Sequence, residues 1–116
     1  MNHYVRKPKD KARILNSDTD EPIGEASFDD LVRALCKSQR YLQATDVFDG
    51  YETRKALLSA KPGDSVPVPD DAWNALVAEA KRPTVLSANF VQSPEALELI
   101  RAITDAPSKD PRTEPD

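Results

Sequence analysis

The chain has 116 residues, of which 39% are hydrophobic and 31% charged, and its formal net charge is −4 at pH 7. This length accommodates one domain with a modest core, and the acidic balance argues against a protein whose main task is to coat nucleic acid or an anionic membrane. A single cysteine excludes an intramolecular disulfide framework, and no apolar run approaches the roughly 20 residues of a membrane span. The first residues, MNHYVRKPKD, lack the apolar segment of a signal peptide, so we expect a cytoplasmic protein.

The N-terminal segment is basic. Because Pro8 prevents an uninterrupted helix, we expect residues 1–13 to form an extended or mobile arm. Its cationic residues are Arg6, Lys7, Lys9, Lys11 and Arg13. Residues 14–106 are expected to form a single globular domain, and the charged, proline-rich residues 107–116 a disordered tail.

Two short stretches have the character of strands. Ala12 to Leu15 and Ile23-Gly24 flank a run of turn formers, which predicts at most a small hairpin. Further along, Ser65 to Pro69 contains Pro67 and Pro69, each of which lacks a backbone N–H. This stretch is therefore either an edge strand or an extended connector.

The clearest helix begins after Ser27, which can cap it. An apolar face follows at helical spacing. The residues on that face are Phe28, Leu31, Val32, Leu35 and Cys36. No helix breaker occurs before Leu42, so the helix can extend that far.

A second helix is predicted to begin near Thr45-Asp46 and to end before Pro62. Its apolar residues Val47, Phe48, Tyr51 and Leu58 can share one stripe, and we expect most aromatic residues to lie in the core. Gly50 would cost about 1 kcal/mol relative to alanine inside a helix. A turn over 46–49 followed by a helix from about residue 51 to 60 fits the pattern equally well.

Two more helices are expected. Asp70 and Asp71 open one that places Trp73, Leu76, Val77 and Ala80 in the core. The other starts at Ser93-Pro94-Glu95 and ends at Pro107, after a connector over residues 84–92. The predicted fold is thus mainly α: a compact bundle of about four short helices, with at most a small N-terminal hairpin or edge strand.

Catalytic and metal-binding residue types are scarce. His3 is the only histidine and Cys36 the only cysteine, so we expect no triad, no zinc site and no cofactor. We predict that Cys36 is a small buried hydrophobic residue. An acidic cluster lacks the spacing of a calcium-binding loop, so we predict that it forms a solvated turn. Its residues are Asp18, Asp20, Glu21 and Glu25. Asp46, Asp49 and Glu52 can share one helical face, where capping and first-turn charge explain the first two.

From Tyr51 onward, the segments YETRKALLSA and KPGDSVPVPDDAW and a final helix opening with SPE follow in a distinctive order. This order resembles that of small uncharacterised proteins encoded by phages and prophages. The resemblance covers about half of the chain and includes no catalytic motif. It implies an accessory, assembly or host-modulating role.

The sequence therefore predicts a non-enzymatic protein-interaction module that can dimerise through surplus apolar surface. The alternative is a nucleic-acid-associated regulator that uses the basic arm together with cationic residues of the first helix and its extension. These additional residues are Arg33, Lys37 and Arg40.

Overall fold

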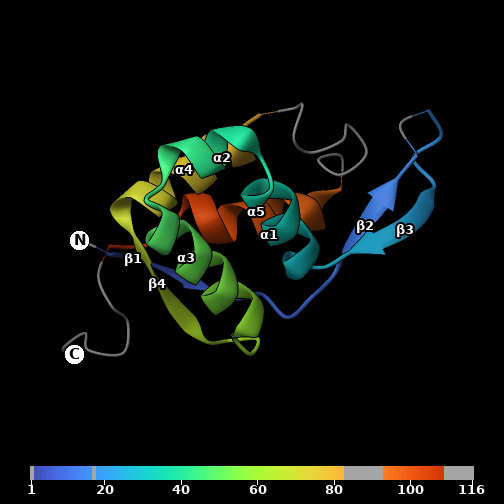
Figure 1. Cartoon of the computed structure of the whole chain (residues 1–116). Helices are drawn as coiled ribbons and strands as arrows, with labels where there is room; N and C mark the ends of the chain where they lie inside the picture. The colour runs from blue at the N-terminus through green and yellow to red at the C-terminus, as the bar shows by residue number, and fades with distance from the viewer. Residues whose placement is uncertain (1, 17, 83–92, 109–116) are drawn as a thin grey trace.

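The computed structural model describes residues 2–16, 18–82 and 93–108 (Figure 1). Along this part of the chain the elements are β1 (Asn2–Arg6), β2 (Ala12–Leu15), β3 (Pro22–Ala26), α1 (Phe28–Cys36), α2 (Gln39–Ala44), α3 (Val47–Ser59), β4 (Ser65–Pro69), α4 (Asp70–Ala80) and α5 (Pro94–Thr104). The connector expected over 84–92 and most of the tail expected over 107–116 lie outside the described residues.

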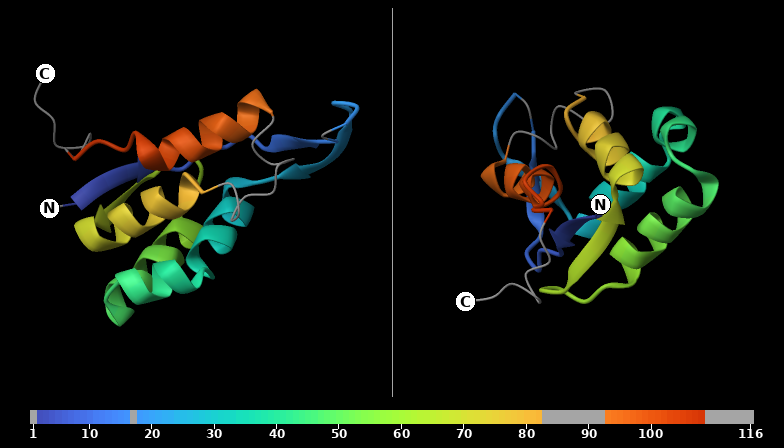
Figure 2. Two further views of the ribbon diagram at one scale, coloured as in Figure 1. Left: turned by 90° about the horizontal axis from the view of Figure 1, so that it is seen from above. Right: turned by 90° about the vertical axis from the view of Figure 1, so that its left-hand side faces the viewer.

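The prediction of a mainly helical bundle is wrong, because the described residues form an α+β fold. Five helices are combined with two antiparallel two-stranded sheets, β1–β4 and β2–β3. The β1–β4 ribbon contacts α3, α4 and α5 and so belongs to the core assembly (Figures 1 and 2). Its two strands come from distant parts of the sequence, so no local sequence pattern predicts that they pair.

The N-terminal residues are part of the folded body. β1 pairs with β4 from Asn2 opposite Pro69 to Arg6 opposite Ser65, and Val5 is fully buried opposite Val66. On the other edge of β1, the Tyr4 N–H donates to the Pro107 carbonyl over 2.8 Å. The segment expected to be an arm separate from the domain is therefore held on both sides by backbone hydrogen bonds over this stretch.

The predicted hairpin is present as β2 and β3, and it projects from the helical body (Figures 1 and 2). Asn16 stabilises its turn by accepting the backbone N–H groups of Asp18 and Thr19. β2 packs against α5, where the Arg13 guanidinium donates two hydrogen bonds to the Glu95 carboxylate. β4 is also a strand, with one edge paired to β1 as the two prolines require.

The amphipathic face of α1 is buried as predicted, and Ser27 caps the helix in a reciprocal capping box with Asp30. The helix ends at Cys36, and α2 begins separately after Ser38, whose side chain accepts the Arg40 N–H. Ser38 thus ends the predicted extension towards Leu42, because a side chain that caps a new helix interrupts the old one.

The buried face of α4 is rotated relative to the prediction. Its small residues Ala72 and Ala75 pack in the core beside Leu76, whereas Trp73 and Val77 are only half-buried. The small side chains let α4 approach its neighbours closely, and the bulky tryptophan lies at the margin. None of the helices in the described ranges is long and apolar enough to cross a membrane.

Candidate functional site

Helix α3 turns Gly50, Thr53 and Leu57 towards the core and the large apolar residues of its first turns towards solvent. Gly50 is buried against the preceding segment, where an added Cβ would lie 2.5 Å from Thr45 Oγ1. The Tyr41 hydroxyl donates to the Gly50 carbonyl over 3.0 Å. This close approach explains why the glycine stands inside an unbroken helix, and it places Thr53 and Leu57 on the same inward stripe.

The outward residues of the first turns form what we call the apolar surface: Val47, Phe48 and Tyr51. Their exposed fractions are 75%, 76% and 61%. The other exposed large apolar residues in the described part of the chain lie singly on three different elements, as Ile23, Leu42 and Leu97. The expectation that these α3 residues share a buried stripe is therefore wrong for its first members, because Gly50 rather than an aromatic ring faces the core.

A groove runs beside this surface, between α3 and β4. One hollow of about 190 Å³ is lined by Asp49, Glu52, Thr53, Ala56, Pro67 and Pro69. A second hollow shares Ala56 and Pro67 with the first and continues towards Gly63. We call the first the acidic hollow.

The β4 side of the acidic hollow offers acceptors only. Pro67 lies opposite Tyr4, whose N–H points away from β4 to Pro107. In an antiparallel ladder, both members of such a pair turn their backbone groups outward, so the Pro67 carbonyl faces away from β1. Neither Pro67 nor Pro69 has an N–H, and this edge therefore has no donor at either position.

Negative charge gathers at the start of α3. Asp46 caps the helix by accepting the N–H groups of Phe48 and Asp49, and its own N–H donates to Asp71 over 3.2 Å. Burial and the neighbouring charges of Asp71 and Asp46 raise the pKa of Asp49. Within the described ranges, none of these three carboxylates forms an ion pair with a cationic side chain.

The structure divides the basic residues that the sequence grouped together. Lys7 is 8% exposed, and its Nζ donates to the carbonyls of Leu57, Leu58 and Ala60 at 3.1, 3.2 and 2.8 Å. The same Nζ lies 2.8 Å from Asp29 Oδ1. Lys7 thus stabilises the C-terminal end of α3, where exposed carbonyls favour a cation.

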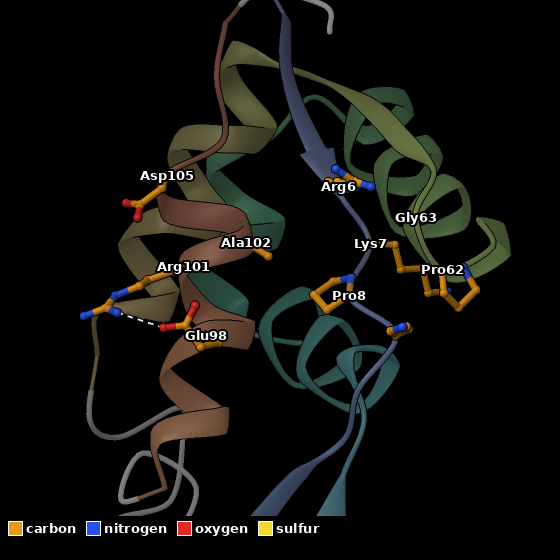
Figure 3. Close-up of a pocket in the computed structure, with 10 residues that line it drawn as sticks. Arg6, Lys7, Pro8, Pro62, Gly63, Glu98, Arg101, Ala102 and Asp105 are labelled. Carbon is orange, nitrogen blue, oxygen red and sulfur yellow. Dashed lines mark hydrogen bonds and ion pairs between the residues drawn. The ribbon is translucent and has the colours of Figure 1, made fainter. Parts of the chain in front are cut away.

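Other members of the basic set remain on the surface. Arg6 and Lys9 line an open hollow of about 650 Å³, to which α5 contributes Arg101 and Glu98 (Figure 3). Arg101 donates to Glu98 over 2.9 Å, and Lys7 extends away towards the segment after α3 (Figure 3). Arg13 is engaged by Glu95, whose pKa it lowers. The remaining members are exposed: Lys11, Arg33, Lys37 and Arg40.

His3 and Cys36 have structural surroundings. The His3 ring stacks on Trp73, and its Nδ1 and Nε2 lie 3.3 Å from the Ala106 carbonyl and 3.2 Å from Asp70 Oδ1. Cys36 is buried, and this burial raises the pKa of its thiol to about 11. A thiolate nucleophile needs the opposite shift.

Among the residues described, no three histidine, cysteine or acidic side chains are grouped so as to hold a metal ion. The acids Asp18, Asp20, Glu21 and Glu25 are exposed in and beside the hairpin turn. None of the residues of the apolar surface was predicted from the sequence to be part of a site. One sequence pattern could have revealed this surface. A second stripe of α3 also has the spacing of a buried face, and it consists of Gly50, Thr53 and Leu57.

Comparisons of the chain with protein-family models, curated proteins and solved structures found no match.

Proposed function

We propose that this chain is a non-enzymatic protein-interaction module whose partner docks on the outer side of α3. The observation that carries the proposal is the grouping of Val47, Phe48 and Tyr51 within the first turns of one helix, all more than 60% exposed. Covering a side chain of this size contributes about 1.5–3 kcal/mol. Such a cluster is typical of the aromatic centre of an interface, whereas scattered single residues are ordinary surface.

The fold supplies a rigid base for this surface. Asp46 caps the N-terminus of α3, Lys7 bonds to its C-terminal carbonyls, and Gly50 packs closely against Thr45 and Tyr41. Held at both ends and along its inner face, α3 presents its outer residues in a fixed arrangement. Preorganisation of this kind reduces the ordering cost of association.

The test compares Phe48→Ser combined with Tyr51→Ser against the matched control Leu97→Ser, which removes an exposed apolar residue from α5. Each protein is immobilised and exposed to bacterial lysate with crosslinking, and self-association is followed by light scattering. We expect the wild type and Leu97→Ser to retain the same partner, or to associate with themselves, and the double variant to lose it. Equal capture by all three proteins would contradict the proposal.

The second half of the chain resembles small phage and prophage proteins. We use this resemblance to propose the biological context of the module. Under the proposal, it acts as an accessory, assembly or host-modulating factor, and its partner is a phage or bacterial protein. Identification of the protein crosslinked through the α3 surface tests this assignment directly.

A second candidate function is nucleic-acid association, favoured by Arg6 and Lys9, which line one open hollow together with Arg101 and its ion-pair partner Glu98. Because Lys7 and Arg13 are engaged within the fold, this cationic surface is smaller than the sequence implied. Fluorescence anisotropy of labelled DNA and RNA at low salt tests it. Salt-dependent binding that is lost in the Arg6→Ser, Lys9→Ser double variant would support this function. An anisotropy that does not change when the protein is added would exclude it.

A further inference from the structure

We propose that the partner which covers the apolar surface is a second copy of this chain, with the two α3 helices packed antiparallel across a two-fold axis near Tyr51 and Glu52. This inference rests on the proposed function and specifies the partner. It follows from the order of apolar and charged residues along the outer side of α3, which is complementary to the same side of a reversed copy.

The outer side of α3 carries one stripe of residues at the i, i+3, i+4 and i+7 spacing of a single helical face. The residues of this stripe are Phe48, Tyr51, Glu52 and Lys55, and all four are exposed. α3 lies on the outside of the body, and no other described element covers its outer side (Figure 2). A second helix laid along the stripe therefore contacts the apolar and the charged residues together.

The charges of α3 are separated along its length. Asp49 and Glu52 lie in the first half of the helix, and Arg54 and Lys55 lie in the second half. Glu52 and Lys55 are one turn apart, yet neither forms an ion pair within the ranges that the structure describes. A helix with this order of charges is complementary to a reversed copy of itself, because the acidic half of each copy lies beside the basic half of the other.

An antiparallel pair centred near Tyr51 and Glu52 aligns the stripe with itself. Phe48 of one copy then lies opposite Lys55 of the second copy, whose aliphatic stem can pack on the ring. The ammonium group of that lysine lies within one turn of Glu52 of the first copy, close enough to form an ion pair. The two-fold axis repeats each contact, so the same arrangement gives two ion pairs and covers the apolar surface of both copies.

Charge selects the antiparallel orientation over the parallel one. In a parallel pair, Glu52 would lie beside Glu52 and Lys55 beside Lys55, and like charges placed side by side are destabilising. In an antiparallel pair, the positive N-terminal end of each helix lies beside the negative C-terminal end of the other. Because each copy uses the same surface once, the assembly closes at two copies.

The experiment measures self-association by sedimentation equilibrium over a range of concentrations, for the wild type, for Glu52→Lys, for Lys55→Glu and for an equimolar mixture of these two variants. We expect the wild type to approach twice the monomer mass as its concentration rises. Each charge variant alone should self-associate about tenfold more weakly, because the symmetry replaces two attractive pairs by two repulsive ones. The mixture should recover the wild-type affinity, since opposite charges meet again at both pairs.

The matched control uses Glu98 and Arg101, an exposed pair on α5 with the same three-residue spacing. Glu98→Lys and Arg101→Glu change the net charge by the same amounts as the α3 variants, so they report any effect of net charge alone. Both should self-associate like the wild type, separately and when mixed. The Phe48→Ser, Tyr51→Ser double variant should remain monomeric.

The outcomes separate the two proposals. A wild type that stays monomeric but captures a different protein through Phe48 and Tyr51 would overturn the second copy as partner and leave the proposed function standing. Self-association that the charge variants do not weaken, that their mixture does not restore, or that persists in the Phe48→Ser, Tyr51→Ser variant would also overturn this inference. If the wild type neither self-associates nor captures a protein through these residues, both proposals fail. Urea unfolding of each variant establishes that the differences arise in the folded state.

Discussion

His3 stacks face to face on Trp73, with ring centroids 3.7 Å apart and planes 3° from parallel. The Trp73 indole N–H donates to the Ile103 carbonyl over 2.9 Å, and the imidazole lies between the Ala106 carbonyl and Asp70. One aromatic pair therefore connects β1, α4 and the end of α5. The only histidine and the only tryptophan join the N-terminal strand to the helical body.

Trp73→Ala should lower the unfolding free energy by about 2–4 kcal/mol, roughly 1 kcal/mol less than the about 3–5 kcal/mol typical of a fully buried tryptophan, because the ring is half-buried. Trp73→Phe retains an aromatic ring but loses the bond to Ile103, and should cost about 1–2 kcal/mol. Urea unfolding followed by circular dichroism measures both. Equal stability of the wild type and Trp73→Ala would show that the stack does not join these elements.

Lys7→Met retains most of the aliphatic stem but removes the donor at the end of α3. It leaves three carbonyls and Asp29 without their cation, so we expect a loss of about 2–4 kcal/mol. Lys9→Met, an exposed neighbour, is the matched control and should change stability by less than about 0.5 kcal/mol. Similar urea midpoints for the two variants would refute the assigned role of Lys7.

Gly50→Ala should destabilise the protein although alanine is the better helix former. Its Cβ would meet Thr45 Oγ1 at 2.5 Å, and overpacking of this kind costs about 1–3 kcal/mol. Thr45→Ala removes that oxygen and should recover part of the loss when combined with Gly50→Ala. A double-mutant cycle from thermal or urea unfolding gives the coupling energy. Strict additivity would contradict close packing at this site.

The buried thiol of Cys36 predicts a pH dependence of stability. Burial raises its pKa from 9.0 to about 11, so the folded state favours the protonated thiol. The resulting stabilisation is complete below about pH 9 and is lost as the pH rises towards 11. The stability of the wild type relative to Cys36→Ala should therefore fall over this interval by an amount on the order of 2 kcal/mol. A difference independent of pH would show that Cys36 is accessible in the folded state.

Elements whose signals are local could be predicted from the sequence. Ser27 and Asp30 form their capping box within four residues, and the apolar spacing of α1 identifies its buried face. Pro67 and Pro69 restrict β4 to an edge, because proline has no N–H to donate on a second side. The turn residues around Asn16 likewise predicted the hairpin.

The fold class and the candidate site depend on contacts between distant residues. The sequence of β1 does not reveal that Val5 pairs with Val66, nor that Lys7 bonds to carbonyls about fifty positions later. The same is true of α3, whose apolar residues suit a core helix by composition. Only the approach of Tyr41 and Thr45 to Gly50 turns Phe48 outward.

The sequence by itself determined where most helices begin, which face of α1 is buried and why β4 lies at an edge. Caps, periodicity and proline act within a few residues, so their effect is readable along the chain. The tertiary structure decided that residues 2–6 of the N-terminal segment form a strand, that Trp73 stacks on His3 and that aromatic residues of α3 face solvent. These outcomes depend on which surfaces pack together, and the balance among competing packings is a property of the whole chain.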